Sequence, residues 1–199
     1  LEQTAAKARE FFKSAQAAKP LKTGEDKEAV DQVPCLWIPA HASGVEDVSM
    51  SGDGQVLASA GGGQRLNIWD GQSGELTREL STDGGAVSSV ALSLDGRLAL
   101  AGGFDLCLRL WDLEHGSLLW TSEEQPDVVE RVAISGDGTF GVSASPGILS
   151  ESDRQLVKWD IASGTMAHSF GGYQDHPTAI ALSPDGRLLA AGDMEGGLK

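Results

Sequence analysis

The chain has 199 residues, of which 40% are apolar and 22% are charged, and this balance excludes wholesale disorder. Its net charge of −14 argues against non-specific binding to nucleic acid and against docking on an anionic membrane, because both need clustered lysine and arginine. No apolar run of about 18 residues occurs, so the sequence predicts no membrane insertion.

The first 33 residues precede the repeats and differ from them in predicted secondary structure. Residues 1–19 are rich in helix formers and predict an N-terminal α-helix with Phe11 and Phe12 on its apolar face. Residues 20–33 are polar and indicate a linker. We expect the helix to dock on the rest of the protein or to belong to an upstream domain, because both phenylalanines need cover.

A repeat governs residues 34–199. The tetrapeptide Ser-x-Asp-Gly occurs four times, at spacings of 42, 42 and 48 residues. A Trp-Asp pair occurs three times, at spacings of 42 and 48 residues, and a glycine follows each tryptophan by five positions. Landmarks that recur in one register indicate a repeat architecture. The aspartates of the tetrapeptides are Asp53, Asp95, Asp137 and Asp185, and the tryptophans are Trp69, Trp111 and Trp159.

Each unit reads as β-structure. An alternating segment such as Val87–Leu92 stands before each Ser-x-Asp-Gly, and this period of two is typical of a half-buried strand. Asp-Gly then predicts a hairpin turn, and the Trp-Asp pair ends a later strand. Four antiparallel strands in about 42 residues make one propeller blade. The units cover about 41–82, 83–124, 125–172 and 173–199.

The segments SGDGQVLASAGGGQRLNIWD and SLDGRLALAGGFDLCLRLWD closely resemble the WD-repeat β-propeller family, with the degenerate Gly-His positions of its bacterial members. The resemblance implies an all-β fold in which residues 34–40 form an outer strand. Such rings commonly have seven blades, so we expect 34–199 to be a partial propeller. The remaining blades would come from a longer chain or from a second polypeptide.

The repeats depart from the family at a buried network. In many members, a His before the first strand bonds an Asp, a Ser and the Trp. The first unit has His41, Ser59 and Trp69 but lacks the Asp, and no unit has every member. We therefore expect the blades to rely on apolar packing and on the hydrogen-bond ladders between strands, and we do not assume that the buried network forms. The His position holds His41, Asp83, Gln125 and Tyr173 in the four units.

The third unit carries six extra residues in the turn after Ser143. The resemblance places this turn on the rim that usually binds partners, together with the four residues at the His position. The insertion either contributes to binding or is tolerated drift, since loop entropy grows slowly with length. The insertion supplies the candidate partner-binding residues Ile148, Leu149, Glu151 and Asp153.

No catalytic, metal or cofactor motif occurs: there is no HExxH, CxxC, GxSxG or phosphate-binding loop. The repeated aspartates and tryptophans are expected to be structural. Trp37 and Trp120 fall on outer strands, where they either mark an interface or pack against a neighbouring blade. Cys35 and Cys107 have no disulfide spacing, which favours the cytoplasm, although any targeting signal before Leu1 would be missing.

Three functions compete. The first is a non-catalytic scaffold that presents the propeller rim to a protein partner. The second is an accessory or regulatory domain of a larger enzyme linked to a kinase, an NTPase or a cytochrome. The third is a ligand or ion in the acidic central channel, although no residue positions such a site.

Overall fold

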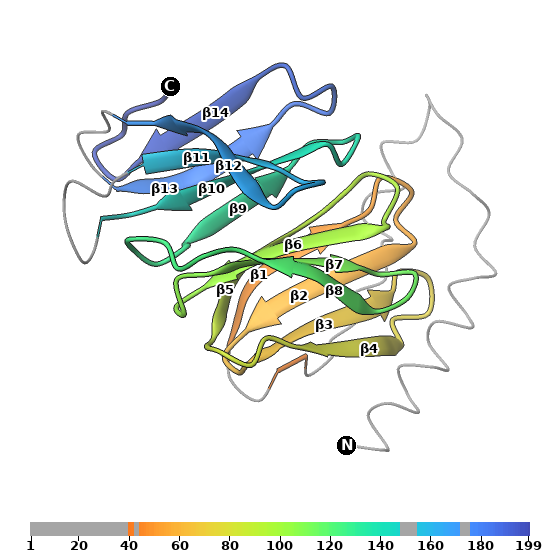
Figure 1. The fold of residues 1–199 in the computed structure, drawn as a ribbon. Helices are drawn as coiled ribbons and strands as arrows, with labels where there is room; N and C mark the ends of the chain where they lie inside the picture. The colour runs from red at the N-terminus through yellow and green to blue at the C-terminus, as the bar shows by residue number, and fades with distance from the viewer. Residues whose placement is uncertain (1–39, 42–43, 148–154, 172–175) are drawn as a thin grey trace.

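The computed structural model describes residues 40–41, 44–147, 155–171 and 176–199. The predicted helix over 1–19, the linker over 20–33 and nearly all of the predicted outer strand over 34–40 lie outside the described residues. The described part is all-β, with fourteen strands in four antiparallel sheets (Figure 1). The predicted all-β class and the predicted four-stranded blades are thereby confirmed. Within these residues, no helix is long and apolar enough to cross a bilayer.

Three sheets are complete blades in which the strands lie side by side in chain order. The first blade has β1 (Val45–Met50), β2 (Val56–Gly61), β3 (Arg65–Asp70) and β4 (Leu76–Ser81). The second has β5 (Val87–Leu92), β6 (Leu98–Gly103), β7 (Leu108–Asp112) and β8 (Ser117–Thr121). The third has β9 (Arg131–Ile134), β10 (Phe140–Ser145), β11 (Gln155–Asp160) and β12 (Thr165–Phe170).

The fourth sheet pairs β13 (Pro177–Leu182) with β14 (Leu189–Asp193). A third strand starts beside β14, because Leu198 forms a bridge to Gly192 and because Ala191 and Lys199 exchange two backbone hydrogen bonds of 3.0 Å. The fourth sheet therefore includes the start of a third strand at Leu198 and Lys199.

The Ser-x-Asp-Gly turn is held by its own side chains. Ser51 Oγ donates to Asp53 Oδ1 (2.7 Å) and accepts from the Val56 amide (3.0 Å), while Asp53 Oδ1 also accepts from the Gln55 amide (3.0 Å). Gly54 has a φ of 71°, a left-handed conformation that favours glycine. The same bonds recur at Ser93 and Asp95, at Ser135 and Asp137, and at Ser183 and Asp185.

These bonds stabilise the ionised carboxylates. The Gln55 amide, followed by the Ser51 hydroxyl, holds the pKa of Asp53 below its ordinary value. In the other three turns, the serine hydroxyl is the main cause of the lowered pKa, and a backbone amide comes second. The chemistry of the turn therefore accounts for the recurrence of these four aspartates.

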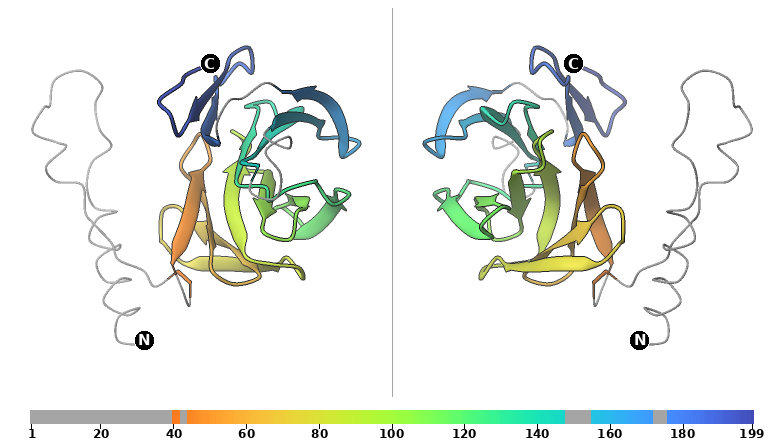
Figure 2. Two further views of the ribbon diagram at one scale, coloured as in Figure 1. Left: turned by 90° about the vertical axis from the view of Figure 1, so that its left-hand side faces the viewer. Right: turned by 90° about the vertical axis from the view of Figure 1, so that its right-hand side faces the viewer.

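The apolar core lies between successive blades. One buried cluster joins Ile68 and Leu80 of the first blade to Val90 and Trp111 of the second. Similar clusters join the second blade to the third and the third to the fourth. Figure 2 shows the sheets following one another in this order. The tryptophans of the Trp-Asp pairs are buried, with 6%, 2% and 3% of their surface exposed at Trp69, Trp111 and Trp159.

Polar side chains also link the first strands of successive blades. Asp47 on β1 accepts a hydrogen bond from the hydroxyl of Ser89 on β5 (2.6 Å), and that hydroxyl accepts from the Val132 amide (3.1 Å). Arg131 on β9 donates to the Thr178 carbonyl (3.1 Å). Asp47, Ser89 and Arg131 occupy the same position in three units, so one repeat position ties each blade to the next.

Trp120 on β8 packs against the neighbouring blade, which was one of the two alternatives for this residue. Its indole Nε1 donates to the Ile161 carbonyl at 2.8 Å. The indole lies over Gly164, where a Cβ atom would come within 2.9 Å of the ring. Trp120 thus holds the outer edge of the second blade against the third.

Candidate partner-binding rim

The turns between the second and third strands of each blade share one rim with the connections between blades (left in Figure 1), whereas the Ser-x-Asp-Gly turns lie on the opposite rim. Of the predicted site residues, the structure places His41, Asp83 and Gln125 on the connections of this rim. The other predicted site residues lie outside the described residues: Tyr173, Ile148, Leu149, Glu151 and Asp153.

His41 is engaged in the fold. Its Nε2 lies 2.9 Å from Ser59 Oγ, and Trp69 Nε1 donates to the same oxygen at 2.9 Å. The three members of the family network that the first unit retains are therefore connected, although the expected Asp position holds Gly63. In the third unit, Trp159 donates to Ser143 in the same way (2.9 Å). Part of the buried network that we did not assume therefore forms in the first and third units.

The second unit replaces this network with an ion pair. Asp105 and Arg109 lie 2.6 Å apart, and their side chains are 13% and 14% exposed. Asp83, at the His position, is instead exposed and accepts a hydrogen bond from Ser81 Oγ (2.6 Å). Sequence reasoning missed Arg109. A signal was available, because the position two residues before the tryptophan holds asparagine and valine in the other complete units.

Phe104 is a large apolar side chain that this rim exposes, at 58% of its surface, as is Met194 at the same position of the fourth unit, at 70%. The Phe104 amide donates to the Ala86 carbonyl (3.1 Å), and Gln125 donates to the Leu106 carbonyl (2.7 Å). Phe104 therefore stands in a turn held between two connections, 82–86 and 122–130. Sequence reasoning missed it, although a phenylalanine in a blade turn is itself a signal for binding.

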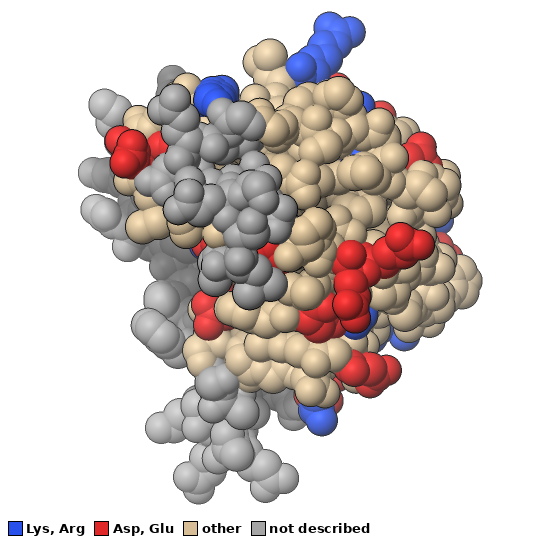
Figure 3. Space-filling view, turned by 60° about the vertical axis from the view of Figure 1, so that its left-hand side comes forward, with Lys and Arg blue, Asp and Glu red and all other residues tan. Residues whose placement is uncertain are grey.

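The surroundings of Phe104 are acidic. Asp83, Glu123 and Glu124 are exposed on the two connections that flank its turn. Burial is the main cause that raises the pKa of the Cys107 thiol, and the negative charge of Asp105 raises it further. In Figure 3, which brings the left side of Figure 1 forward, more acidic than basic side chains are visible. The rim thus combines an exposed aromatic ring with negative charge.

The repeated carboxylates are held in turns. Those of the tetrapeptides bond to serine hydroxyls and backbone amides, and those of the Trp-Asp pairs cap the next turn. Asp70, for example, accepts from the Gln72 and Ser73 amides at 3.0 and 2.6 Å. Among the described residues, no group of three or more His, Cys, Asp or Glu side chains is placed to hold a metal ion.

A family model described as "WD domain, G-beta repeat" matches residues 33–70, 74–112 and 164–199. The model leaves residues 113–163 unmatched, and these contain the insertion of the third unit. The structure nevertheless forms a four-stranded blade there. No curated protein matches the chain.

Among solved structures, the chain is similar to hydrazine synthase from Kuenenia stuttgartiensis, with a TM-score of 0.67 and 19% sequence identity. The similarity covers 78% of this chain and 45% of that one. At this identity the likeness shows a shared fold, and the chain spans less than half of the solved chain.

Proposed function

Because this chain belongs to the WD-repeat family, we propose that it is a non-catalytic scaffold that presents its acidic rim to a protein partner. The observation that carries the proposal is Phe104, which is 58% exposed between two connections that carry acidic side chains. Exposed aromatic side chains are enriched where protein interfaces are strongest. The partner would bring a basic surface with an apolar pocket for the ring.

Site-specific cross-linking tests this proposal. A photoreactive phenylalanine in place of Phe104 should cross-link a partner in the cells that make the protein. The same group in place of Gln72, which is exposed on the opposite rim, is the matched control and should not. Reversing the charge of Glu123 and Glu124 to lysine should reduce the cross-link at position 104. Equal cross-linking from both rims would overturn the proposal.

We also propose that further blades cover the free face of the first blade. Val48 and Met50 are 59% and 58% exposed, although the equivalent Val90 and Leu92 of the second blade are 3% and 7% exposed. The second pair is buried because it packs into the core shared with the first blade. A blade before β1 would bury Val48 and Met50 in the same way. It would come from a longer chain or from a second polypeptide.

A second candidate function is an accessory domain of a larger enzyme. The similarity to hydrazine synthase favours it, because the matched part is only 45% of that chain and the rest of that chain lies outside the match. Sequencing the gene on both sides of the present chain distinguishes the two functions. A catalytic domain in the same reading frame would support the accessory role, and further repeats alone would support the scaffold.

A further inference from the structure

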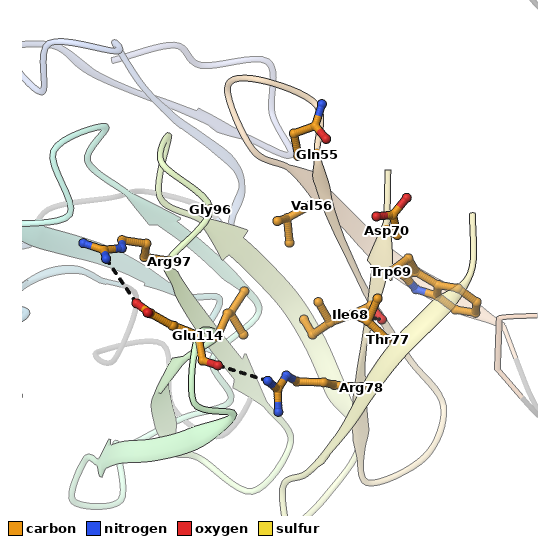
Figure 4. Close-up of a pocket in the computed structure, with 11 residues that line it drawn as sticks. Gln55, Val56, Ile68, Trp69, Asp70, Thr77, Arg78, Gly96, Arg97 and Glu114 are labelled. Carbon is orange, nitrogen blue, oxygen red and sulfur yellow. Dashed lines mark hydrogen bonds and ion pairs between the residues drawn. The ribbon is translucent and has the colours of Figure 1, made fainter. Parts of the chain in front are cut away.

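A cleft of about 490 Å³ opens between the first and second blades, on the rim opposite to Phe104. Val56, Ile68 and Leu113 supply its apolar lining, and Arg78 and Arg97 carry the positive charges (Figure 4). Its volume lies within the range of about 300–1,000 Å³ that is usual for ligand sites. The proposed rim function makes no use of this cleft.

The boundary between the second and third blades differs from the first at this place. Arg78 of the first unit and Trp120 of the second occupy the same repeat position, 42 residues apart. Trp120 lies against Gly164 of the third blade, and Arg78 lies in the same way against Gly116 of the second. An apolar indole therefore covers this glycine at one boundary, and a charged side chain covers it at the other.

Other lining positions also differ between the two boundaries. Where the first boundary has Thr77, Arg97 and Glu114, the second has leucine, threonine and alanine at the equivalent positions. Arg78 and Glu114 therefore distinguish this boundary from the second, whereas the position of Arg97 is again arginine in the fourth unit, at Arg187. The second and third blades pack together without these charges, so the charges are available for binding.

The charges leave one guanidinium without a carboxylate partner. Arg97 pairs with the Glu114 carboxylate at 3.1 Å, whereas Arg78 donates to the Glu114 backbone carbonyl at 3.0 Å. Among the residues that the structure describes, no carboxylate forms an ion pair with Arg78. Asp70 also lines the cleft, but it lies away from Arg97 in Figure 4, and its Oδ1 is engaged by the amides of its own turn.

We propose that this cleft binds an acidic, extended segment of a partner protein. An apolar side chain of the segment packs on Val56 and Leu113, and a carboxylate of the segment accepts hydrogen bonds from Arg78. The occupant is a peptide because Thr77 and Arg78 belong to β4, the outer strand of its sheet, whose free edge can pair with an extended chain. The charge complementarity selects an acidic sequence.

The test uses a fluorescein-labelled short peptide that alternates leucine with aspartate and glutamate, and its binding is measured by fluorescence anisotropy. A matched peptide with asparagine and glutamine in place of the acids is the ligand control. Arg78→Gln removes the charge, and Arg78→Trp places the indole of the second unit into the first cleft. Arg65→Gln is the protein control, because Arg65 is an exposed arginine of the same blade that lies outside the cleft.

We expect Arg78→Gln to raise the Kd of the acidic peptide about tenfold, as for the loss of a charged hydrogen bond. Arg78→Trp should raise it at least as much by filling the cleft, while Arg65→Gln should leave it nearly unchanged. Thermal melts establish that each variant is folded, and Arg78→Gln decides alone if the tryptophan variant does not fold.

Three results would overturn the proposal. They are no binding of the acidic peptide, equal binding of its amide counterpart, or displacement of the peptide by inorganic phosphate, which would indicate a phosphorylated ligand. Cross-linking at position 104 does not depend on this cleft, so the rim proposal and the cleft proposal can fail separately.

Discussion

Replacing Trp111 with alanine tests how much the apolar core between blades contributes to the stability of the fold. Trp111 is 2% exposed and belongs to the cluster that joins the first two blades, together with Ile68 and Leu80. Alanine would remove nearly the whole indole and leave a cavity at a boundary that the second blade shares with the first. The loss therefore affects the attachment of one blade to another as well as the blade itself.

The magnitude follows from the area buried. A buried tryptophan removes about 200 Å² from water, which at about 25 cal/mol per Å² corresponds to about 5 kcal/mol. Measured losses for large aromatic residues in cores run at about 3–5 kcal/mol. Because folded domains are stable by only about 5–15 kcal/mol, Trp111→Ala should remove a large fraction of the stability.

Urea unfolding followed by circular dichroism measures this loss directly. Trp111→Phe is the conservative control, and it should cost less than Trp69→Phe, because Trp69 donates to a buried serine hydroxyl whereas the equivalent position beside Trp111 is Ala101. The difference should be about 1 kcal/mol, the net value of one hydrogen bond. A loss below about 1 kcal/mol for Trp111→Ala would show that the indole does not hold the two blades together.

Three further predictions follow from the turns and faces. Gly164→Ala should destabilise the protein by about 1 kcal/mol or more in urea melts, because φ is 69° and a Cβ would strike Trp120, whereas Gly171→Ala, with nothing within 4 Å, should have little effect. The double variant Val48→Asp, Met50→Asp should weaken the association of this chain with further blades, as measured by sedimentation velocity. Unchanged association would contradict the proposal that further blades cover the first blade. The turn carboxyls have a lower pKa in the folded chain, so their contribution to stability is complete above about pH 4 and is lost as the pH falls through the folded values. Replacing these aspartates with asparagine should make the free energy of unfolding less dependent on pH below about pH 5, as measured by urea melts. An unchanged pH dependence would count against the role of these residues: Asp53, Asp95, Asp137 and Asp185.

The fold could be predicted from the sequence because its determinants are local. A serine and an aspartate two residues apart close each hairpin with their own side chains, as Ser51 and Asp53 do. A strand that alternates in polarity needs no distant partner to be recognised. Repetition at a fixed spacing then shows that each unit packs on the next.

The site residues that were missed depend on contacts between elements. Arg109 gains its role from Asp105, and the sequence does not show that this ion pair stands where other units use a tryptophan-bound serine. Phe104 is exposed because its turn is held between two connections, which only the assembled blades reveal. Arg78 is informative because Gly116 of the next blade lies beneath it. The contacts of Phe104 and Arg78 join separate elements and have no spacing that could be found along the chain, whereas Asp105 and Arg109 are four residues apart.

The repeat separates residues that build the fold from residues that select a partner. Every unit has the serine and aspartate of the first turn, so these side chains answer a requirement that each blade shares. Arg78 stands where the next unit has Trp120, and Phe104 stands where the first and third units have glycine and proline. Because the blades on both sides fold without these two side chains, their chemistry is free to serve recognition. Substitutions at the shared positions should therefore lower stability, and substitutions at the differing positions should lower binding at unchanged stability.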